Sequence, residues 1–201
     1  MWTWLVATWL STPVTIDPSS LFVIRVDRDE STLLSGLSHN HAIRAASFRA
    51  EANLDSDPGK CTFSVTIPVR KLRVDEPSMR RRFQLEGELD EDDRADIRKN
   101  MLADDQLDAN THPEIGMKAT YCRLGANALT LEGKLSIRGV TRGVKARLER
   151  SDVNDGQVRL KGSIPIRATD FGFEPYSAAL GSLKNRDEMR IHIELVASIP
   201  P

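Results

Sequence analysis

The chain has 201 residues, of which 40% are hydrophobic, so it can bury one all-β core or two small ones. Its 28 basic and 29 acidic residues leave a formal net charge of -1, which gives no overall field to attract nucleic acid or an anionic membrane. No nucleic-acid partner is therefore expected. Two local charge runs, basic at residues 80–82 and acidic at residues 86–96, show no apolar strand pattern and are expected to be solvated surface.

Residues 1–13 form an apolar N-terminal extension ahead of a single candidate domain at residues 14–199. The apolar run at residues 2–10 is too short to span a bilayer as a helix, so no transmembrane segment is expected. It resembles a signal segment only weakly, because no Lys or Arg precedes it and no clear small-x-small cleavage site follows. These features favour an intracellular protein, with a periplasmic or secreted protein as the alternative.

Residues 129–149 show a pattern that recurs along the chain. Apolar Leu129, Leu131 and Leu135 alternate with polar residues, and a second alternation follows after Gly139. This is typical of two half-buried strands joined by a short turn. Further windows alternate in the same way, which predicts about eight strands in antiparallel order: residues 21–26, 42–54, 61–69, 115–121, 158–166 and 189–197.

Residues 90–102 break the strand pattern. Acidic residues come first, basic residues follow, and apolar residues recur at helical spacing, which predicts a short amphipathic helix. One helix cannot cover the apolar face of about eight strands, so the sheet is expected to close on itself or to stack as a sandwich. Gly133, Gly139 and Gly162, in or beside strands, favour closure into a barrel. In such a barrel the inserted helix is expected to pack over one open end.

Cys61 and Cys122 are the two cysteines of the chain. Cys61 shares the apolar phase of its strand, whereas Cys122 falls on the polar phase of its own. Even if these strands pair, the two Cβ atoms are then expected to point to opposite sides of the sheet, unless a bulge resets the phase. A disulfide is therefore not expected, and the thiols say little about the compartment.

Five short motifs occur in a fixed order along residues 14–198. The most distinctive is LSIRGVTR at residues 135–142. The others are TIDPS at residues 15–19, THPEI at 111–115, TDFGF at 169–173 and GSLKNRDEM at 181–189. Each motif is weak alone, but together and in this order they resemble the YceI-like, polyisoprenoid-binding protein family.

The resemblance implies an antiparallel, lipocalin-like β-barrel whose interior binds an amphiphilic isoprenoid lipid of polyprenol, polyprenyl phosphate or quinone type. It implies no required cofactor and no catalytic chemistry common to the family; the lipid is the expected partner, and a homodimer is left open. The family often carries aromatic residues where this chain has Gln106-Leu107-Asp108-Ala109, which predicts a looser or differently shaped cavity mouth.

Strand phase indicates which side chains face the barrel interior. Phe171 and Phe173 follow a strand and are expected near one mouth of the barrel. Arg138 and Arg142 bracket a turn and are candidates for binding a polar or pyrophosphate head group, with a solvated hairpin tip as the alternative. The residues predicted to line a lipid-binding cavity are Phe63, Val65, Ile67, Met117, Ala119, Leu131, Leu135, Ile137, Ile164, Phe171, Phe173, Ile191 and Ile193.

Two other functions stay open from the sequence. His39 and His41 would share one face of an extended segment, as metal ligands of an enzyme do, with His112 or Asp170 as a third ligand. A lone His-x-His pair is a weak metal signal and no Gly-x-Ser-x-Gly motif is present, so catalysis is less favoured than binding. The other alternative is a barrel filled by its own side chains that acts as an interaction module. His192 falls on the polar face of the last strand and is expected to be solvated.

Overall fold

The computed structural model describes residues 12–55, 57–153 and 157–198, and these residues form an almost entirely antiparallel β structure. The apolar run at residues 2–10, interpreted as a weak signal segment, lies outside the described residues. None of the described helices has the length and hydropathy that crossing a bilayer requires.

The described elements comprise strands, two α-helices and four single-turn 3-10 helices. The strands are β1 (Thr12–Ile16), β2 (Leu21–Arg28), β3 (His41–Ala45), β4 (Arg49–Leu54), β5 (Thr62–Pro68), β6 (Leu72–Val74), β7 (Glu114–Leu124), β8 (Ala128–Ile137), β9 (Val140–Asp152), β10 (Gln157–Arg167), β11 (Ser177–Ala178) and β12 (Leu183–Ser198). The helices are α1 (Pro77–Arg82), α2 (Glu91–Leu102), η1 (Ser35–Leu37), η2 (Val69–Lys71), η3 (Thr169–Phe171) and η4 (Ala179–Gly181).

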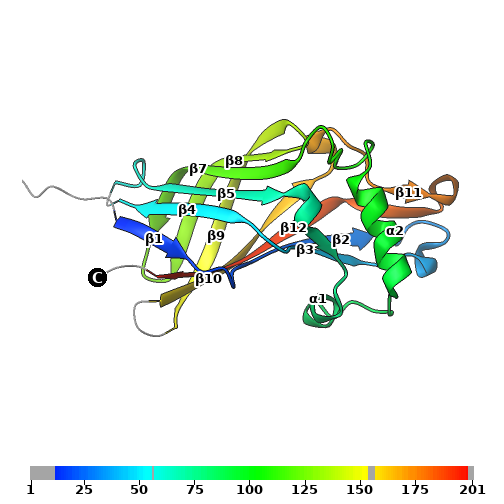
Figure 1. Ribbon diagram of the computed structural model, residues 1–201, viewed down its shortest axis with the longest axis horizontal. Coiled ribbons are helices and arrows are strands. Elements are labelled where there is room, and N and C mark those ends of the chain that lie inside the picture. Colours follow the sequence, from blue (N-terminus) through cyan, green and yellow to red (C-terminus); the bar gives the residue numbers. More distant parts are fainter. Residues whose placement is uncertain (1–11, 56, 154–156, 199–201) are drawn as a thin grey trace, which may run out of the picture.

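The sheet closes into a barrel with eight positions in its wall (Figure 1). Three positions each hold two strands end to end. Strands β1 and β2 both pair with β12, β4 pairs with β1 while β3 pairs with β2, and β5 pairs with β4 while β6 pairs with β3. Strands β7, β8, β9, β10 and β12 fill the other positions, and the pairing of Thr15 with Ser198 closes the ring. The predicted antiparallel barrel of about eight strands is confirmed.

The strand predicted at residues 42–54 is interrupted between β3 and β4, at Ala46, Ser47 and Phe48. The chain between β1 and β2 breaks at the same level, in a turn where the Asp17 side chain accepts a hydrogen bond from the Ser19 backbone N–H at 2.7 Å. A proline inside this turn cannot donate a ladder hydrogen bond, which explains the break. The two breaks together line a groove in the barrel wall.

Cys61 and Cys122 form a disulfide, contrary to the prediction from strand phase. The pairing of β7 with β8 shifts register between Ala119 and Tyr121, so Thr120 is an extra residue on β7. This bulge resets the phase and turns Cys122 inward, where both cysteines are buried with Cα atoms 5.5 Å apart, within the usual disulfide range. The bridge joins the residue directly before β5 to β7, at the end of the barrel opposite α2 (Figure 1).

Helix α2 confirms the helix predicted at residues 90–102. Its N-terminus has a capping box: the Asp90 side chain accepts from the Asp93 backbone N–H, and the Asp93 carboxylate accepts from the Asp90 backbone N–H. The helix lies across the strands near one end of the barrel (Figure 1), and Ile97 and Met101 pack against the core.

Helix α1 is absent from the sequence-based expectations, because residues 80–82 have the composition of a solvated charge run. The helix begins with Pro77, whose fixed φ suits the first helical position. The prediction of a solvated run is wrong for Arg80, which is only 6% exposed. The Arg80 guanidinium donates hydrogen bonds to the carbonyls of Asn40 and Gly87, so its burial is compensated.

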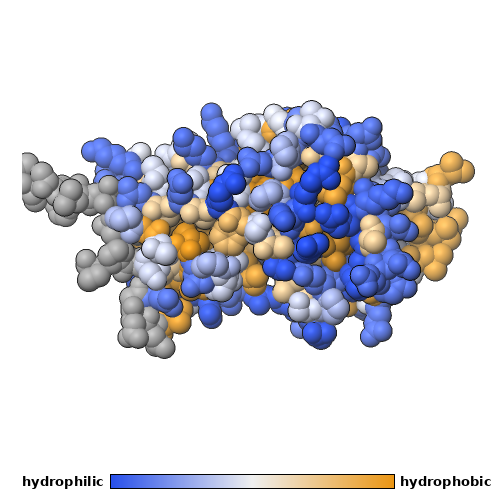
Figure 2. Space-filling view, in the orientation of Figure 1, coloured by the Kyte–Doolittle hydropathy of each residue, from blue (hydrophilic) through white to orange (hydrophobic). Residues whose placement is uncertain are grey.

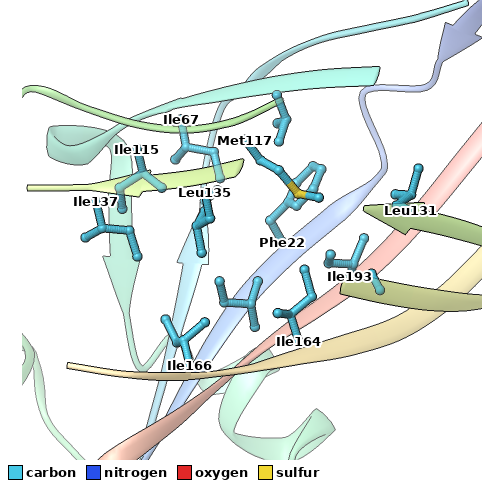
Figure 3. Packing of buried hydrophobic residues seen from close by; sticks show 14 of the residues in the cluster. Phe22, Ile67, Ile115, Met117, Leu131, Leu135, Ile137, Ile164, Ile166 and Ile193 are labelled. Atoms are coloured by element: carbon cyan, nitrogen blue, oxygen red, sulfur yellow. The ribbon is translucent and has the colours of Figure 1, made fainter. Parts of the chain in front are cut away.

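The barrel interior is one apolar cluster to which strands on all sides contribute (Figure 3). Ile67, Met117, Leu135 and Ile164 point into this interior from β5, β7, β8 and β10. Alternate residues on the same strands are less buried, which is the two-residue period from which the barrel was predicted. The core of the protein and the inside of the barrel are therefore the same region.

Candidate functional site

An apolar cavity of about 130 Å³ lies at the barrel end that α2 covers, and we call it the mouth cavity. Strands β2, β3, β6, β7, β8, β10 and β12 form its wall, while α2 and the loops after α2 and β10 cover it. Asn100, Tyr176 and Arg186 are exposed members of its lining, so the cavity reaches the surface. The complete lining is Ile24, Val26, His41, Ile43, Leu72, Ile97, Asn100, Met101, Gln106, Leu107, Ile115, Ile137, Ile166, Ala168, Phe173, Pro175, Tyr176, Asn185, Arg186 and Met189.

Two smaller cavities continue the interior toward the disulfide. The middle cavity, of about 40 Å³, has part of its wall in common with the mouth cavity. The shared residues are Ile24, Ile43, Leu72, Ile115 and Ile137. The far cavity, of about 30 Å³, is lined in part by the two disulfide cysteines. At roughly 10–15 Å³ per water molecule, the middle and far cavities are narrow, so the interior beyond the mouth is close to packed.

The residues predicted to line one cavity are all buried, but they are divided among three. Ile137 and Phe173 line the mouth cavity, and Phe63 and Leu131 line the far cavity. The other predicted residues, apart from Ala119 and Phe171, line the middle cavity, which Ile137 also borders. The middle set is Val65, Ile67, Met117, Leu135, Ile137, Ile164, Ile191 and Ile193. Ala119 and Phe171 are buried without lining any of the three.

Sequence reasoning missed much of the mouth cavity, because its cover lies outside the alternating strands. Ile97 and Met101 reach it from α2, and Gln106 and Leu107 from the following loop. These loop residues belong to the segment 106–109, from which a looser or differently shaped cavity mouth was predicted. The signal for the helical pair was present in the apolar spacing of residues 90–102, but that spacing does not say which cavity the helix covers.

Arg138 and Arg142, the predicted head-group candidates, line none of the three cavities. Arg138 has a positive φ of 51° in the turn between β8 and β9. Its guanidinium donates to the carbonyls of Asp104 and Gly172 at 2.6 and 3.1 Å, whereas Arg142 is exposed on β9. The contacts of Arg138 therefore tie together the loops after α2 and β10, both of which border the mouth.

A buried polar network lies beside the mouth cavity. Asp75 is 0% exposed, and its Oδ2 lies 2.6 Å from Nδ1 of His41. Its Oδ1 accepts hydrogen bonds from the Ala42 backbone N–H at 2.9 Å and from the Arg80 guanidinium at 3.2 Å. Arg80 thus balances the charge of the buried carboxylate, and His41 is the member of the network that lines the mouth cavity.

Asp75 and Arg80 were not identified from the sequence. Asp75 takes a positive φ of 50° between β6 and α1, which few residues other than Gly, Asn and Asp adopt. The acidic residues directly before Pro77 are a helix-start signal that could have predicted α1. Nothing local indicates that the helix buries Arg80 against Asp75 and the carbonyl of Asn40, which directly precedes β3.

His39 lies in the loop before β3, whereas His41 is the first residue of β3, so the two do not lie on one strand. Its ring packs against Gly87, where an added Cβ would lie 3.4 Å from the imidazole. The pKa of His39 is lowered, first by burial, then by electrostatic interaction with His41 and by the positive charge of Arg80. These surroundings favour the neutral imidazole.

The third ligand that a metal site would need is not assembled. Within the described residues, no three His, Cys, Asp or Glu side chains are grouped so that they could hold a metal ion. His112 packs beside Gly139, and Asp170 is exposed in η3. Neither joins His39 and His41 in such a group.

The prediction that His192 is solvated is wrong. Phe83, which follows α1, covers the imidazole with ring centroids 4.9 Å apart. Among the described residues, the buried Nε2 of His192 has no hydrogen-bond partner. The pKa of His192 is lowered, first by burial and then by the positive charges of Arg190 and Arg25.

Two loops beside the mouth cavity expose leucine side chains, which we call the leucine tip (Leu33, Leu37 and Leu180). Leu33 is 88% exposed and Leu37 is 70% exposed, and Leu180 is fully exposed. The Leu34 backbone N–H donates to the Ser182 carbonyl at 3.1 Å, which holds the two loops side by side. Figure 2 shows an apolar patch at this end of the molecule. Such exposure of large apolar side chains is unusual unless they have a partner.

The closed antiparallel barrel, its apolar interior and its helix-covered mouth define a lipocalin-like β-barrel with a cavity at one end. The family model for the YceI-like domain matches residues 15–197, so the chain belongs to the YceI-like family. The resemblance found in the five sequence motifs is therefore confirmed. Among curated proteins, no sequence matches the chain.

Solved structures share the fold at low sequence identity. A polyisoprenoid-binding domain from Saccharophagus degradans, implicated in plant cell wall breakdown, aligns with a TM-score of 0.60 at 10% identity, over 94% of this chain and 99% of that one. BcnA of Burkholderia cenocepacia aligns with a TM-score of 0.59 at 18% identity, over 87% and 95% of the two chains. A YceI protein of Campylobacter jejuni gives 0.54 at 16% identity, over 79% and 84%.

Proposed function

We propose that the barrel binds an amphiphilic isoprenoid lipid, of polyprenol, polyprenyl phosphate or quinone type, and carries or sequesters it. The observation that supports this most directly is the apolar wall that the mouth and middle cavities share. The lipid chain would follow this wall inward from α2, and the polar end would stay at the mouth. Family membership and the polyisoprenoid-binding description of the Saccharophagus degradans domain point the same way.

Binding a whole chain requires the interior to widen. The mouth cavity, at about 130 Å³, is smaller than the roughly 300–1,000 Å³ of typical small-molecule sites. Three methionines lie along the proposed path: Met101 and Met189 at the mouth and Met117 in the middle cavity. Methionine changes shape at low cost, and each methylene that enters an apolar interior contributes about 0.8 kcal/mol, so lipid entry can drive the widening.

The narrow middle cavity also favours a second candidate, a barrel filled by its own side chains that acts as an interaction module. The two candidates predict different effects of a substitution at Ala45, which lines the middle cavity. They predict the same effect at the exposed neighbour Ala46. Ala45→Phe would occupy the proposed lipid path, whereas Ala46→Phe would not. Overpacking at Ala45 is expected to cost about 1–3 kcal/mol in either case.

The deciding experiment is titration of wild type, Ala45→Phe and Ala46→Phe with geranylgeraniol, together with native mass spectrometry of protein purified without detergent. Lipid binding predicts uptake by wild type and Ala46→Phe, and uptake at least tenfold weaker in Ala45→Phe. If wild type takes up no isoprenoid and carries none from its host, the filled barrel is the correct reading. Circular dichroism reports whether Ala45→Phe is folded.

The disulfide supports a site of action outside the reducing cytosol, because such bridges form and persist in secreted and periplasmic proteins and are rare in the cytosol of most organisms. This reverses the intracellular preference drawn from the N-terminal segment. Alkylation of Cys61 and Cys122 in protein taken rapidly from the native host tests it. Free thiols on both residues would contradict an oxidising compartment.

A further inference from the structure

We propose that Nε2 of His41 is the polar contact for the head group of the bound amphiphile, and that it selects head groups that donate a hydrogen bond, such as a terminal hydroxyl. The inference rests on the proposed function and adds a ligand class to it. Its basis is the network of His41, Asp75 and Arg80 beside the mouth cavity.

Asp75 orients the imidazole and sets its tautomer. The carboxylate Oδ2 lies 2.6 Å from Nδ1 of His41, and a carboxylate can only accept there, so the Nδ1 atom carries a proton. Arg80, at 3.2 Å from Oδ1, already balances the charge of Asp75, so the network needs no second positive charge. In a neutral imidazole protonated at Nδ1, Nε2 is an acceptor.

Nε2 is the part of the network that is left for a ligand. Among the described residues it has no hydrogen-bond partner, and the His41 side chain, 13% exposed, is on the wall of the mouth cavity. A lipid that fills this cavity removes the remaining water from Nε2. An acceptor that loses water without gaining a donor costs free energy, so the ligand is favoured if it brings a donor to this position.

Three other polar side chains of the mouth, Asn100, Gln106 and Arg186, are already paired. The Asn100 amide donates to the Tyr176 hydroxyl at 3.2 Å, and the Gln106 amide donates to the Glu174 carbonyl at 3.2 Å. Arg186 lies 3.9 Å from Glu30. Among the described residues the Asn185 side chain has no hydrogen bond, but no buried group orients it as Asp75 orients His41. His41 is therefore the side chain of the mouth best prepared to recognise a polar head group.

The test compares geranylgeraniol with its methyl ether, which keeps the chain and the oxygen but lacks the donor. A net hydrogen bond predicts that wild type binds the alcohol about three- to tenfold more tightly than the ether. His41→Phe keeps the ring volume without Nε2 and is expected to bind both equally. His39→Phe is the matched control, since His39 lines none of the three cavities, and it should keep the preference.

Equal binding of alcohol and ether by wild type, or an unchanged preference in His41→Phe, overturns the proposal while leaving isoprenoid binding intact. If wild type binds neither compound, the proposed function itself fails. Because His41→Phe leaves Asp75 without one partner, wild type provides a second readout. The ¹⁵N resonance of the Nε2 atom of His41 should shift when the alcohol binds and stay in place with the ether; no shift with bound alcohol also overturns the proposal.

An independent observation, the leucine tip, carries a second inference: we infer that Leu33, Leu37 and Leu180 insert into a lipid membrane. They protrude from two separate loops, between β2 and β3 and between β11 and β12, and a fluid lipid layer can accept such isolated side chains without a complementary shape. Tyr176 and Arg186, which line the mouth cavity, lie on the same stretch of chain as Leu180. A membrane on the tip would therefore face the cavity opening.

Charge near the tip does not select an anionic membrane. Lys184 and Arg186 are basic, but Asp29 and Glu30 lie beside them, and Arg186 is 3.9 Å from Glu30. The three leucines are then the main attraction, and neutral lipid should suffice. This distinguishes the tip from a polybasic membrane anchor, whose binding depends on anionic lipid.

Cosedimentation with phosphatidylcholine vesicles tests the tip. Wild type should bind, and the triple variant Leu33→Ser, Leu37→Ser, Leu180→Ser should bind at least tenfold more weakly, with an unchanged melting temperature. Adding phosphatidylglycerol should change wild-type binding less than twofold. If wild type does not bind vesicles, the membrane inference is wrong. If light scattering shows a dimer that the triple variant abolishes, the tip is a protein interface and the membrane inference is again wrong.

Discussion

A Cβ atom on Gly133 would lie 2.7 Å from the Cα of Ala119, its partner across the pairing of β7 and β8. No real side chain tolerates such an approach, so the backbones can come this close only because residue 133 is glycine. The contact sits directly before the bulge at Thr120, which turns Cys122 toward Cys61. The glycine and the disulfide are therefore two parts of one local arrangement.

Gly133→Ala should push β7 and β8 apart and lower the free energy of unfolding by about 1–3 kcal/mol. Gly143→Ala on β9 is the matched control, because nothing lies within 4 Å of its added Cβ, and it should change stability by about 0.5 kcal/mol or less. Urea denaturation followed by circular dichroism measures both. Equal stability of Gly133→Ala and wild type would mean that the close approach is absent in solution.

Removal of the disulfide should destabilise the barrel. The bridge joins residues 61 apart in sequence, for which the chain-entropy relation gives a loss of about 4 kcal/mol on conversion of Cys61 and Cys122 to Ser. Denaturation midpoints of the double variant and of oxidised and reduced wild type provide the measurement. Reduced wild type should resemble the variant; if reduction has no effect on the wild type, the bridge is not formed.

Arg80→Leu should leave the Asp75 carboxylate buried without its compensating charge. Breaking one side of a buried ion pair typically lowers the free energy of unfolding by about 3–5 kcal/mol. Arg81→Leu makes the same chemical change one residue later on the exposed surface of α1 and should cost about 0.5 kcal/mol or less. Thermal melts of the pair distinguish the buried charge from a general effect on the helix, which would lower both equally.

His192 should make stability depend on pH. Its pKa in the folded protein lies below the ordinary value of 6.5, so the unfolded chain takes up the proton first as the pH falls. Stability is therefore highest above pH 6.5 and declines as the pH drops from there toward the folded pKa. The melting temperature of His192→Leu should decline less than that of wild type over this range, with a residual slope from His39, whose pKa is also lowered. Parallel curves for the two proteins would contradict the assignment.

The strands and the closing helix were predictable because burial of one sheet face imposes a two-residue period that the sequence displays directly. Residues 115–121, for example, became β7 with the expected side chains inward. The disulfide was not predictable, since it depends on one extra residue, Thr120, whose neighbours carry no bulge signal. A single inserted position reverses every inward and outward assignment that follows it.

Part of the candidate site could likewise be predicted from the sequence, and part could not. Ile137 and Phe173 were expected at a cavity because strand phase and a following turn place them there. Asp75 and Arg80 join His41 through tertiary contacts across loops, which no periodicity encodes. Arg138 had the chemistry of a head-group ligand, but the positive φ of its turn aims it at loop carbonyls. The residue type indicated what each side chain can bind, but only the fold determined which group it contacts.

The pairing of Thr15 with Ser198 has a consequence for how the chain acquires its structure. Strand β1 can pair with β4 early, but its second edge has no partner until β12 has been synthesised. Local hairpins such as β7, β8 and β9 can therefore form while the ring stays open. Until closure, both edges of the growing sheet remain unpaired and able to recruit other chains. Barrel closure is thus a late and slow event, and an interrupted chain that lacks β12 would be an aggregation hazard for the cell rather than a smaller working domain.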